Sequence, residues 1–415
     1  MTENHLLCET MKQRAPQKRL GGMLGFLVGA SAMFATMYST QAILPTIGRA
    51  FHVAPSHAGL TISVLVLAMV VGAWMWGPLS DRVGRRRCLI VASALLVPAT
   101  IAVAVAPTFE VLIATRFIQG LILPGLLVVG LPYVSEVFVP AIGARAMGWY
   151  MASLISGGLI GRLGVALVAA VTGWRVALGV LSILPLVAVG VMSRTLPPAP
   201  ARHRSARAGR LMNRRVAAAA MAGPALFFVF VGVFSYIGYR LEAAPFNLSP
   251  TITSLVFVVW IAGAVAPIAG RRAERHGWSA VALVGAILAS LGLALTVPDH
   301  MSTIVTGLMC ITIGMFTVVT AAPIGVGGAR GVRPGAASAL YYSIYYFSGA
   351  VGAFLPGLAW QRTGWAGVVG VSALALMIAL VGALLGRADE RGRRVRLSTI
   401  RAAVIRRLTT AGWPS

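Results

Sequence analysis

The sequence predicts an all-α membrane protein with twelve transmembrane helices, built as two parallel repeats of six helices. First, 58% of the 415 residues are hydrophobic and only 11% are charged, and the mean hydropathy is +0.85. These values exclude a soluble globular protein, a secreted disulfide scaffold and a disordered chain. Second, the apolar residues form long runs, and about 20 such residues span a bilayer as a helix. Third, residues of the first half recur in the second half at a nearly constant spacing.

The apolar runs give the expected transmembrane helices in order, near residues 22–44, 58–80, 88–106, 111–134, 147–171, 176–194, 216–238, 251–270, 278–297, 302–326, 336–359 and 366–386. The longest polar interruption, 196–215, is rich in Pro, Ala and Arg, which is typical of a linker. It separates an amino-terminal half (1–195) from a carboxyl-terminal half (216–386), and a basic tail (387–415) follows.

Basic residues are distributed unevenly over the loops. With twelve spans both termini lie on one side, and that side holds all but six of the 35 Lys and Arg. The opposite loops hold only Arg49, Arg175, Arg240 and Arg362. Because cytoplasmic loops carry an excess of Lys and Arg, both termini and the linker are expected in the cytoplasm. The net charge of +25 is therefore interpreted as a topology signal and a contact to anionic lipid, and a nucleic-acid partner is not expected.

The sequence lacks the residues that several other classes of function require. The only lysines, Lys12 and Lys18, precede the first span and no GK[ST] phosphate loop exists, which excludes an ATP-driven pump within this chain. Three distant cysteines without CxxC spacing suggest neither a metal site nor a disulfide framework. No cofactor and no catalytic residue are expected. A polytopic membrane enzyme, which would need clustered acids, histidines or a nucleophile, is the remote alternative.

An internal repeat relates the two halves. At an offset of 191 or 193 residues, eight positions recur as Tyr150/Tyr341, Gly158/Gly349, Gly161/Gly352, Gly173/Gly364, Trp174/Trp365, Gly77/Gly270, Asp81/Glu274 and Gly84/Gly277. Parallel halves of this kind suit a central cavity at their interface, reached from each side in turn.

A charged loop, GPLSDRVGRRR, follows the second span at residues 77–87, and its notable residues are Gly77, Asp81, Arg82, Gly84, Arg85 and Arg86. The two glycines permit close backbone approach and a tight turn. The aspartate can face a helix amino terminus, and the arginines can pair with acids on neighbouring helices. Such contacts could form in one conformation and break in another. The alternative is a basic loop that only sets the topology.

This loop resembles the signature loop of the major facilitator superfamily. Arg116, Gln119 and Gly120 in RFIQG resemble a fourth-span motif of drug–proton antiporters, and GGLIGR (157–162) resembles their glycine-rich fifth-span motif, although without its usual proline. YSTQAILP, SYIGYRLEAAPFNLS and GWR resemble a bacterial inner-membrane subgroup of efflux transporters. The resemblance implies that the loop stabilises the outward-open state, with Glu136 at the end of the fourth span as the partner acid.

The resemblance also implies a function, a location and partners. We expect a monomeric secondary transporter of the bacterial inner membrane that exports small amphipathic or drug-like molecules by proton-coupled alternating access. The alternative is proton-coupled uptake or export of a sugar or an organic anion.

Two arginines, Arg116 and Arg162, lie inside spans, in the half of the bilayer away from the termini. A central arginine costs about 2.5–3.5 kcal/mol on insertion scales. We expect Arg116, its neighbour Gln119 and Arg162 to serve substrate binding or coupling. The alternative is that the arginines extend to the membrane interface.

No Asp or Glu lies in the middle of a span. Proton coupling is therefore implied only by the resemblance. If protons are coupled, Glu242 and Glu136 are the candidate carriers, with Arg240 as the expected ion-pair neighbour of Glu242; an ordinary interface ion pair is the alternative for Glu242.

The central cavity, by the same resemblance, should be lined from the first, fourth, seventh and tenth spans with help from the fifth, eighth and eleventh. The polar and aromatic candidates are Tyr38, Gln41, Phe234, Tyr341 and Tyr345. Aromatic residues at helical spacing are also typical of plain packing. An aromatic cavity with few fixed charges suits an amphipathic compound.

Overall fold

The computed structural model describes residues 3–138, 145–198 and 210–410, and these residues form helices without any β-strand. The first half contains α1 (Glu3–Tyr38), η1 (Gln41–Ile43), α2 (Leu44–Phe51), α3 (Pro55–Val83), α4 (Arg85–Ala104), α5 (Phe109–Ile122), α6 (Pro124–Tyr133), η2 (Val134–Phe138), α8 (Arg145–Leu159), η3 (Ile160–Gly164), α9 (Val165–Thr172), α10 (Trp174–Leu181) and α11 (Ile183–Thr195).

The second half contains α12 (Arg214–Glu242), α13 (Pro250–Ser254), η4 (Leu255–Val265), α14 (Ala266–His276), α15 (Trp278–Leu295), α16 (Met301–Gly327), α17 (Pro334–Thr363) and α18 (Trp365–Thr410). α18 continues as one helix into the basic tail. The expected linker, 196–215, lies largely outside the described residues.

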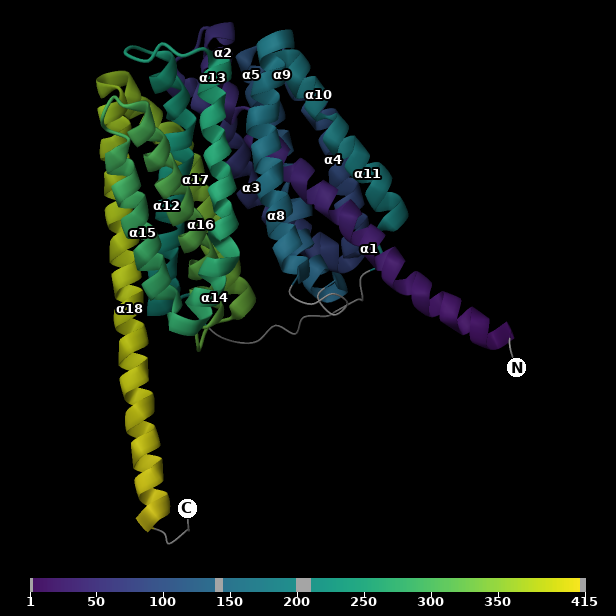
Figure 1. The fold of residues 1–415 in the computed structure, drawn as a ribbon, viewed down its shortest axis with the longest axis vertical. Helices are drawn as coiled ribbons and strands as arrows, with labels where there is room; N and C mark the ends of the chain where they lie inside the picture. Colours follow the sequence, from purple (N-terminus) through teal and green to yellow (C-terminus); the bar gives the residue numbers. More distant parts are fainter. Residues whose placement is uncertain (1–2, 139–144, 199–209, 411–415) are drawn as a thin grey trace.

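The expected number of spans is confirmed with one qualification. Within the described ranges, eleven helical stretches are long and apolar enough to cross a membrane. The remaining expected span, α17, has 30 residues and is long enough, but its tyrosines and serines lower its hydropathy. The chain runs back and forth so that both described ends lie at the same end of the bundle, as Figure 1 shows. We call this the terminal end and its opposite the far end.

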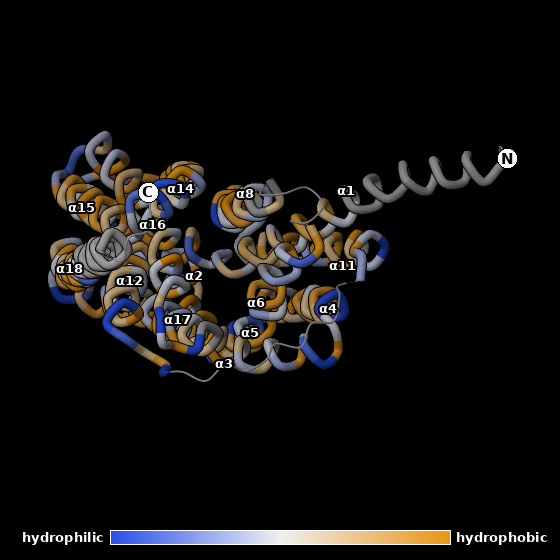
Figure 2. Tube along the Cα trace, turned by 90° about the horizontal axis from the view of Figure 1, so that it is seen from below, coloured by the Kyte–Doolittle hydropathy of each residue, from blue (hydrophilic) through white to orange (hydrophobic). Residues whose placement is uncertain are grey.

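The surface and the core have the distribution expected in lipid. Large apolar side chains such as Trp74, Val171 and Leu291 are more than half exposed. Viewed from the terminal end, Figure 2 shows two groups of predominantly apolar helices side by side. Because lipid tails offer no hydrogen bonds, exposed apolar helices with buried polar groups indicate a membrane-spanning bundle.

The internal repeat is visible in the backbone. Gly84, between α3 and α4, has φ +96°, and its repeat partner Gly277, between α14 and α15, has φ +100°. Both torsions fall in the region that favours glycine. The same sharp turn therefore joins corresponding spans of the two halves.

Side-chain hydrogen bonds join the two halves at the far end. Gln361 Nε2 on α17 donates to Ser56 Oγ on α3 at 2.8 Å. Tyr239 on α12 donates to the carbonyl oxygen of Leu44 at 3.1 Å. The α3–α17 contact is close, because a Cβ on Gly59 would lie 2.4 Å from the carbonyl oxygen of Ala353.

Candidate functional site

The first span is broken where Arg116 meets it. α1 ends at Tyr38, and a short 3-10 turn, η1, precedes α2, so the expected continuous helix over 22–44 is interrupted. Helix ends leave carbonyl oxygens unpaired, and these need partners away from water. Arg116, which is fully buried, supplies a donor to two of them: its N–H groups donate to the carbonyl oxygens of Thr36 and Met37 at 3.1 and 3.0 Å. The same guanidinium donates over 2.8–3.5 Å to the carbonyl oxygen of Thr61 in α3, the hydroxyls of Ser39 and Thr40, and Gln119 Oε1.

These contacts define what Arg116 and Gln119 can do. A guanidinium has five N–H donors, and Arg116 directs all of them at protein acceptors. Gln119 Nε2 also donates inside the protein, to Thr100 Oγ1 at 3.1 Å. Extension of Arg116 to the membrane interface is thereby excluded. The arrangement favours a structural cap of the broken span over contact with a substrate.

Arg162 lies in the π-helical turn η3 and, like Arg116, is fully buried. Its Nε donates to Gln41 Oε1 at 2.7 Å, and its Nη1 donates to the carbonyl oxygen of Gly158 at 3.0 Å. The guanidinium carbon lies 3.8 Å from the ring centroid of Tyr38 and 3.9 Å from that of Trp260. Arg162 therefore sits between two aromatic rings, one from each half, a strong cation–π arrangement.

Gln41 connects Arg162 to the second half. Its Oε1 accepts from Arg162, while its Nε2 donates to Ser235 Oγ at 3.2 Å and to the carbonyl oxygen of Val231 at 3.4 Å. Tyr38, Gln41 and Arg162, proposed separately from the sequence, are thus brought together at the interface of the halves.

An aromatic layer surrounds this cluster. Trp260 lies 5.1 Å from Phe230 and 5.2 Å from Phe316, measured between ring centroids. Phe234, a candidate from the sequence, lies 4.7 Å from Phe230 and is fully buried. The layer presents apolar, polarisable faces next to a buried cation, which suits an amphipathic or aromatic compound.

The tyrosines of α17 contact Phe227 and one another. Tyr345 is stacked on Phe227 with ring centroids 4.1 Å apart, and Tyr341 is 1% exposed. Tyr342 is more open, at 37% exposure. The observed contact of Tyr345 is therefore packing against a neighbouring helix, the alternative to lining a cavity.

The charged loop lies at the terminal end, in the first half. Gly84 forms the expected tight turn. The close approach expected at Gly77 is absent in this conformation, because a Cβ there would meet nothing within 4 Å. Asp81 has a 56% exposed side chain and lies 3.8 Å from Arg85 Nη2. Arg82 is exposed.

The loop arginines have different partners. Arg85 Nε lies 2.9 Å from Glu136 Oε2, and both side chains are almost fully buried, so the expected pair between the loop and the fourth span is confirmed. Among the described residues, Arg86 forms no ion pair with an acid. It donates instead to the carbonyl oxygens of Ser193 and Leu196 at 2.6 and 2.7 Å, where it caps the end of α11.

The expected pairing of Arg240 with Glu242 is wrong. Residues two apart on a helix point to nearly opposite sides, so the two side chains diverge. Glu242 instead forms an ion pair with Arg49 of the first half, with Nη1 and Oε2 2.6 Å apart. Arg240 pairs with Asp299 at 2.9 Å within the second half.

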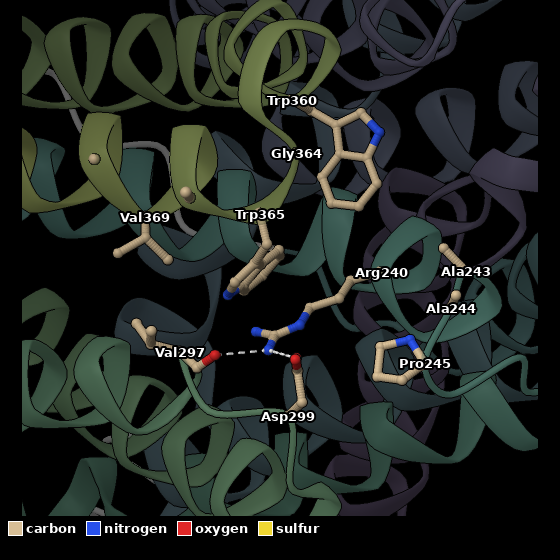
Figure 3. A pocket seen from close by; sticks show the side chains of 12 residues that line it. Arg240, Ala243, Ala244, Pro245, Val297, Asp299, Trp360, Gly364, Trp365 and Val369 are labelled. Atoms are coloured by element: carbon tan, nitrogen blue, oxygen red, sulfur yellow. Dashed lines mark hydrogen bonds and ion pairs between the residues drawn. The ribbon is translucent and has the colours of Figure 1, made fainter.

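Arg240 lines a pocket of 520 Å³ at the far end of the second half, shown in Figure 3 with Trp360 and Trp365 on its walls. Its guanidinium is already occupied: it donates to Asp299 and to the carbonyl oxygens of Thr296, Val297 and Pro298. The pocket therefore offers aromatic walls but no free cation from Arg240.

Sequence reasoning missed Trp260, Arg49 and Ser235 as interface residues. Only one signal for Trp260 was present, an aromatic residue inside the apolar eighth span. In the described part of the chain, no group of three or more His, Cys, Asp or Glu is placed to hold a metal ion.

Comparisons with known proteins agree with this architecture. The family model of the Major Facilitator Superfamily matches residues 25–353. The inner membrane transport protein YnfM of Escherichia coli strain K12 is 30% identical over 86% of this chain and 88% of its own length. The MFS-type transporter YybF of Bacillus subtilis strain 168 is 28% identical over 86% of this chain and 90% of its own.

Solved structures share the fold. A bacterial homologue of the human lysosomal transporter Spinster, in an inward-facing, unoccupied conformation, has a TM-score of 0.72 at 12% identity, covering 89% of this chain and 97% of that one. A D-xylose–proton symporter has a TM-score of 0.69 at 15% identity, covering 89% and 96%. By its family match, its relatives and its fold, this chain belongs to the Major Facilitator Superfamily and is a multi-pass membrane transporter.

Proposed function

We propose that this transporter exports small amphipathic molecules across the bacterial inner membrane by proton-coupled alternating access. The observation that carries the proposal is the composition of the interface between the halves: an aromatic layer around the buried cation Arg162, between α1, η3 and η4. Such a layer accommodates apolar and aromatic groups without fixing one hydrogen-bonding pattern, which suits amphipathic compounds.

The orientation follows from the basic residues. The loops of the terminal end carry nearly all of them, so we place this end in the cytoplasm. The far end then faces outward, and the contacts Arg49–Glu242, Gln41–Ser235 and Tyr239–Leu44 close the interface on that side. This conformation corresponds to an outward-closed state, and the likeness to an inward-facing structure supports it.

The loop at 77–87 is proposed as the gate of the opposite state. Here Asp81 is mostly exposed, and a Cβ on Gly77 would meet no described residue within 4 Å, which fits a gate that is not engaged. Arg85, held by Glu136, would keep the loop in shape while Asp81 and Gly77 meet the second half in the outward-open state.

Glu242 is the candidate for proton coupling. Its side chain is 11% exposed, and it holds Arg49 across the interface at the far end. A proton on Glu242 would remove the charge that attracts Arg49 and so favour opening outward. Glu136 is less suited to a changing role, because it is paired with Arg85 within one half.

The test starts from an unbiased compound screen. Overexpressing and deletion strains are compared for growth inhibition by a chemical library, and compounds that separate the strains are then measured in everted membrane vesicles. We expect uptake into everted vesicles, which equals export from the cell, and its collapse with a protonophore. Uptake that persists without a proton gradient would exclude proton coupling. Transport only in the opposite direction would exclude export.

A second candidate is proton-coupled transport of a sugar or an organic anion. The buried Arg162 favours it, because a fixed cation attracts anions, and a D-xylose–proton symporter shares the fold. The Salmonella typhimurium multidrug resistance protein MdtM, 26% identical over 40% of this chain, favours the first candidate. Including sugars and small hydrophilic carboxylates, which lack an apolar body, in the vesicle panel separates the two.

A further inference from the structure

Three irregular helical segments meet at Arg162. Gln41 lies in the 3-10 turn η1, Arg162 in the π-helical turn η3, and Trp260 in the 3-10 segment η4. η3 packs against both η1 and η4, so the three interruptions lie at one level. Interruptions of regular helix geometry recur at functional sites, because they turn side chains and backbone groups toward a site.

The guanidinium at this junction lacks a negative partner. Arg162 forms no ion pair with any residue that the structure describes. Its Nε and Nη1 donate to neutral acceptors, Gln41 and the Gly158 carbonyl. Its Nη2 is buried, and no acceptor among the described residues lies in hydrogen-bonding geometry with it, although the Tyr38 side chain interacts with the guanidinium. Buried charges are normally paired, so this cation is incompletely compensated by the protein.

A second donor beside it is also without a partner. Trp260 Nε1 is buried and has no acceptor among the described residues. The same indole ring is stacked on the Arg162 guanidinium, with 3.9 Å between ring centroid and guanidinium carbon. Two orphan donors, one from each half, thus lie next to one another. Groups of this kind in native structures call for an explanation, and a bound acceptor is one.

Resting on the export function proposed above, we propose that Arg162 and Trp260 bind the carboxylate of the transported molecule, so that the substrates are amphipathic organic carboxylates. A carboxylate offers two acceptor oxygens and one negative charge, which matches two donors and one unpaired cation. The apolar body of the substrate would lie against the surrounding rings of Phe230 and Phe316. Because the two donors belong to different halves, the bound carboxylate would bridge them.

Binding without any gradient tests this site. Purified full-length protein is titrated calorimetrically with 2-naphthoate, 4-phenylbutyrate and octanoate, each paired with its neutral primary amide. We expect the wild type to bind at least one carboxylate about tenfold more tightly than its amide, as a charged hydrogen bond allows. Absence of binding by all three carboxylates, or equal affinity for the amides, overturns the proposal.

Variants assign the preference to the two donors. Trp260→Phe keeps an aromatic ring and removes the N–H, and Arg162→Lys keeps the charge and removes the planar fork. Both should reduce the preference for carboxylate over amide at least severalfold, because the carboxylate loses a charge-assisted contact that the neutral amide never makes at full strength. Trp360→Phe, a tryptophan of the far-end pocket, is the matched control and should retain it. If one variant does not fold, the other variant provides the test. A folded variant that still prefers carboxylate over amide as strongly as the wild type shows that the substituted residue does not bind the carboxylate.

The outcome is separable from the export proposal. Measured export of neutral or cationic compounds, together with no carboxylate binding, overturns this inference and leaves the export function standing. Carboxylate binding that depends on Arg162 and Trp260, with no energised export, supports the site and overturns the export function.

Discussion

The two halves share a close contact between a glycine and the backbone of a neighbouring helix, but the residue that follows the glycine differs between them. In the first half Gly161 packs on the backbone of α1, where a Cβ would lie 2.2 Å from the carbonyl oxygen of Ala35. In the second half Gly352 packs in the same way on α12, 2.6 Å from the carbonyl oxygen of Phe228. The next residue is Arg162 in one half and Ala353 in the other.

This difference shows which features the repeat requires. Small residues let neighbouring helices approach closely, so the glycines serve the fold in both halves. The buried cation is not needed for that packing, since the second half does without one at the corresponding position. The asymmetry therefore points to function, and the first half carries the charge while Trp260 of the second half covers it.

The largest effect is expected at Arg116, which caps the broken first span. Arg116→Ala removes one donor from each of the carbonyl oxygens of Thr36, Met37 and Thr61. It should lower stability by about 3 kcal/mol or more. The thermal midpoint and the yield of monodisperse protein measure it. Arg362→Ala, at an exposed arginine of the second half, is the control. A variant as stable as the wild type would remove the capping role.

Arg162→Ala makes the first half resemble the second at this position. We expect export to fall by at least about tenfold while the protein still folds, because the charged hydrogen bonds to substrate are lost. Arg116→Lys is the comparison: it should reduce the amount of folded protein more than the transport rate per molecule. Equal and mild effects on transport in both variants would favour purely structural roles.

Asp81 and Glu274 occupy corresponding places in the two halves, but only the first half has the full charged loop. Asp81→Asn should abolish transport without affecting membrane insertion, because the outward-open state loses its gate. Glu274→Gln should have little effect. Vesicle transport normalised to protein content measures both. Unchanged transport in Asp81→Asn would falsify the gating role.

Gly158 and Gly349 separate contacts between the halves from contacts within one half. A Cβ at Gly158 would lie 2.8 Å from Trp260 of the other half, and one at Gly349 would lie 2.1 Å from Phe227 of its own half. Overpacking costs about 1–3 kcal/mol, so Gly349→Ala should lower the thermal midpoint. Gly158→Ala should reduce transport with a smaller loss of stability, because the halves can separate.

Gly190→Ala is the control for this pair, since a Cβ there meets nothing within 4 Å. If Gly158→Ala and Gly349→Ala reduce stability and transport in the same proportion, the halves do not separate to accommodate the added Cβ at Gly158, and the expected difference between the two contacts is wrong.

The smallest effect is expected at the far-end ion pairs. Glu242→Gln removes the negative charge from the Arg49 contact between the halves, and Asp299→Asn does the same to the Arg240 contact within one half. Partly exposed ion pairs contribute about 0.2–1 kcal/mol, so neither change should unfold the protein. Glu242→Gln should make export less dependent on external pH, whereas Asp299→Asn should not. The same pH profile in Glu242→Gln as in the wild type assigns Glu242 to an ordinary interface ion pair.

The sequence by itself determined the helical class, the path of the chain and the distribution of charge between the ends. Bilayer thickness fixes the length of each span, and the loop arginines mark one side, so these features are local. The repeat also predicted corresponding turns, as Gly84 and Gly277 show. The resemblance of the loop to its family gave Glu136 as the partner acid, and the structure identified Arg85 as the residue that it pairs with.

Only the tertiary structure decided the partners of the buried charges. Arg116 turned out to cap α1, Arg240 to meet Asp299, and Arg162 to lie between Tyr38 and Trp260. These contacts join residues that lie 59 to 124 positions apart in the sequence. Those of Arg116 and Arg162 also depend on interruptions in the helices. The hydrophobic pattern of a span records that it crosses the membrane; it does not record its rotation or its breaks, which packing between the helices sets.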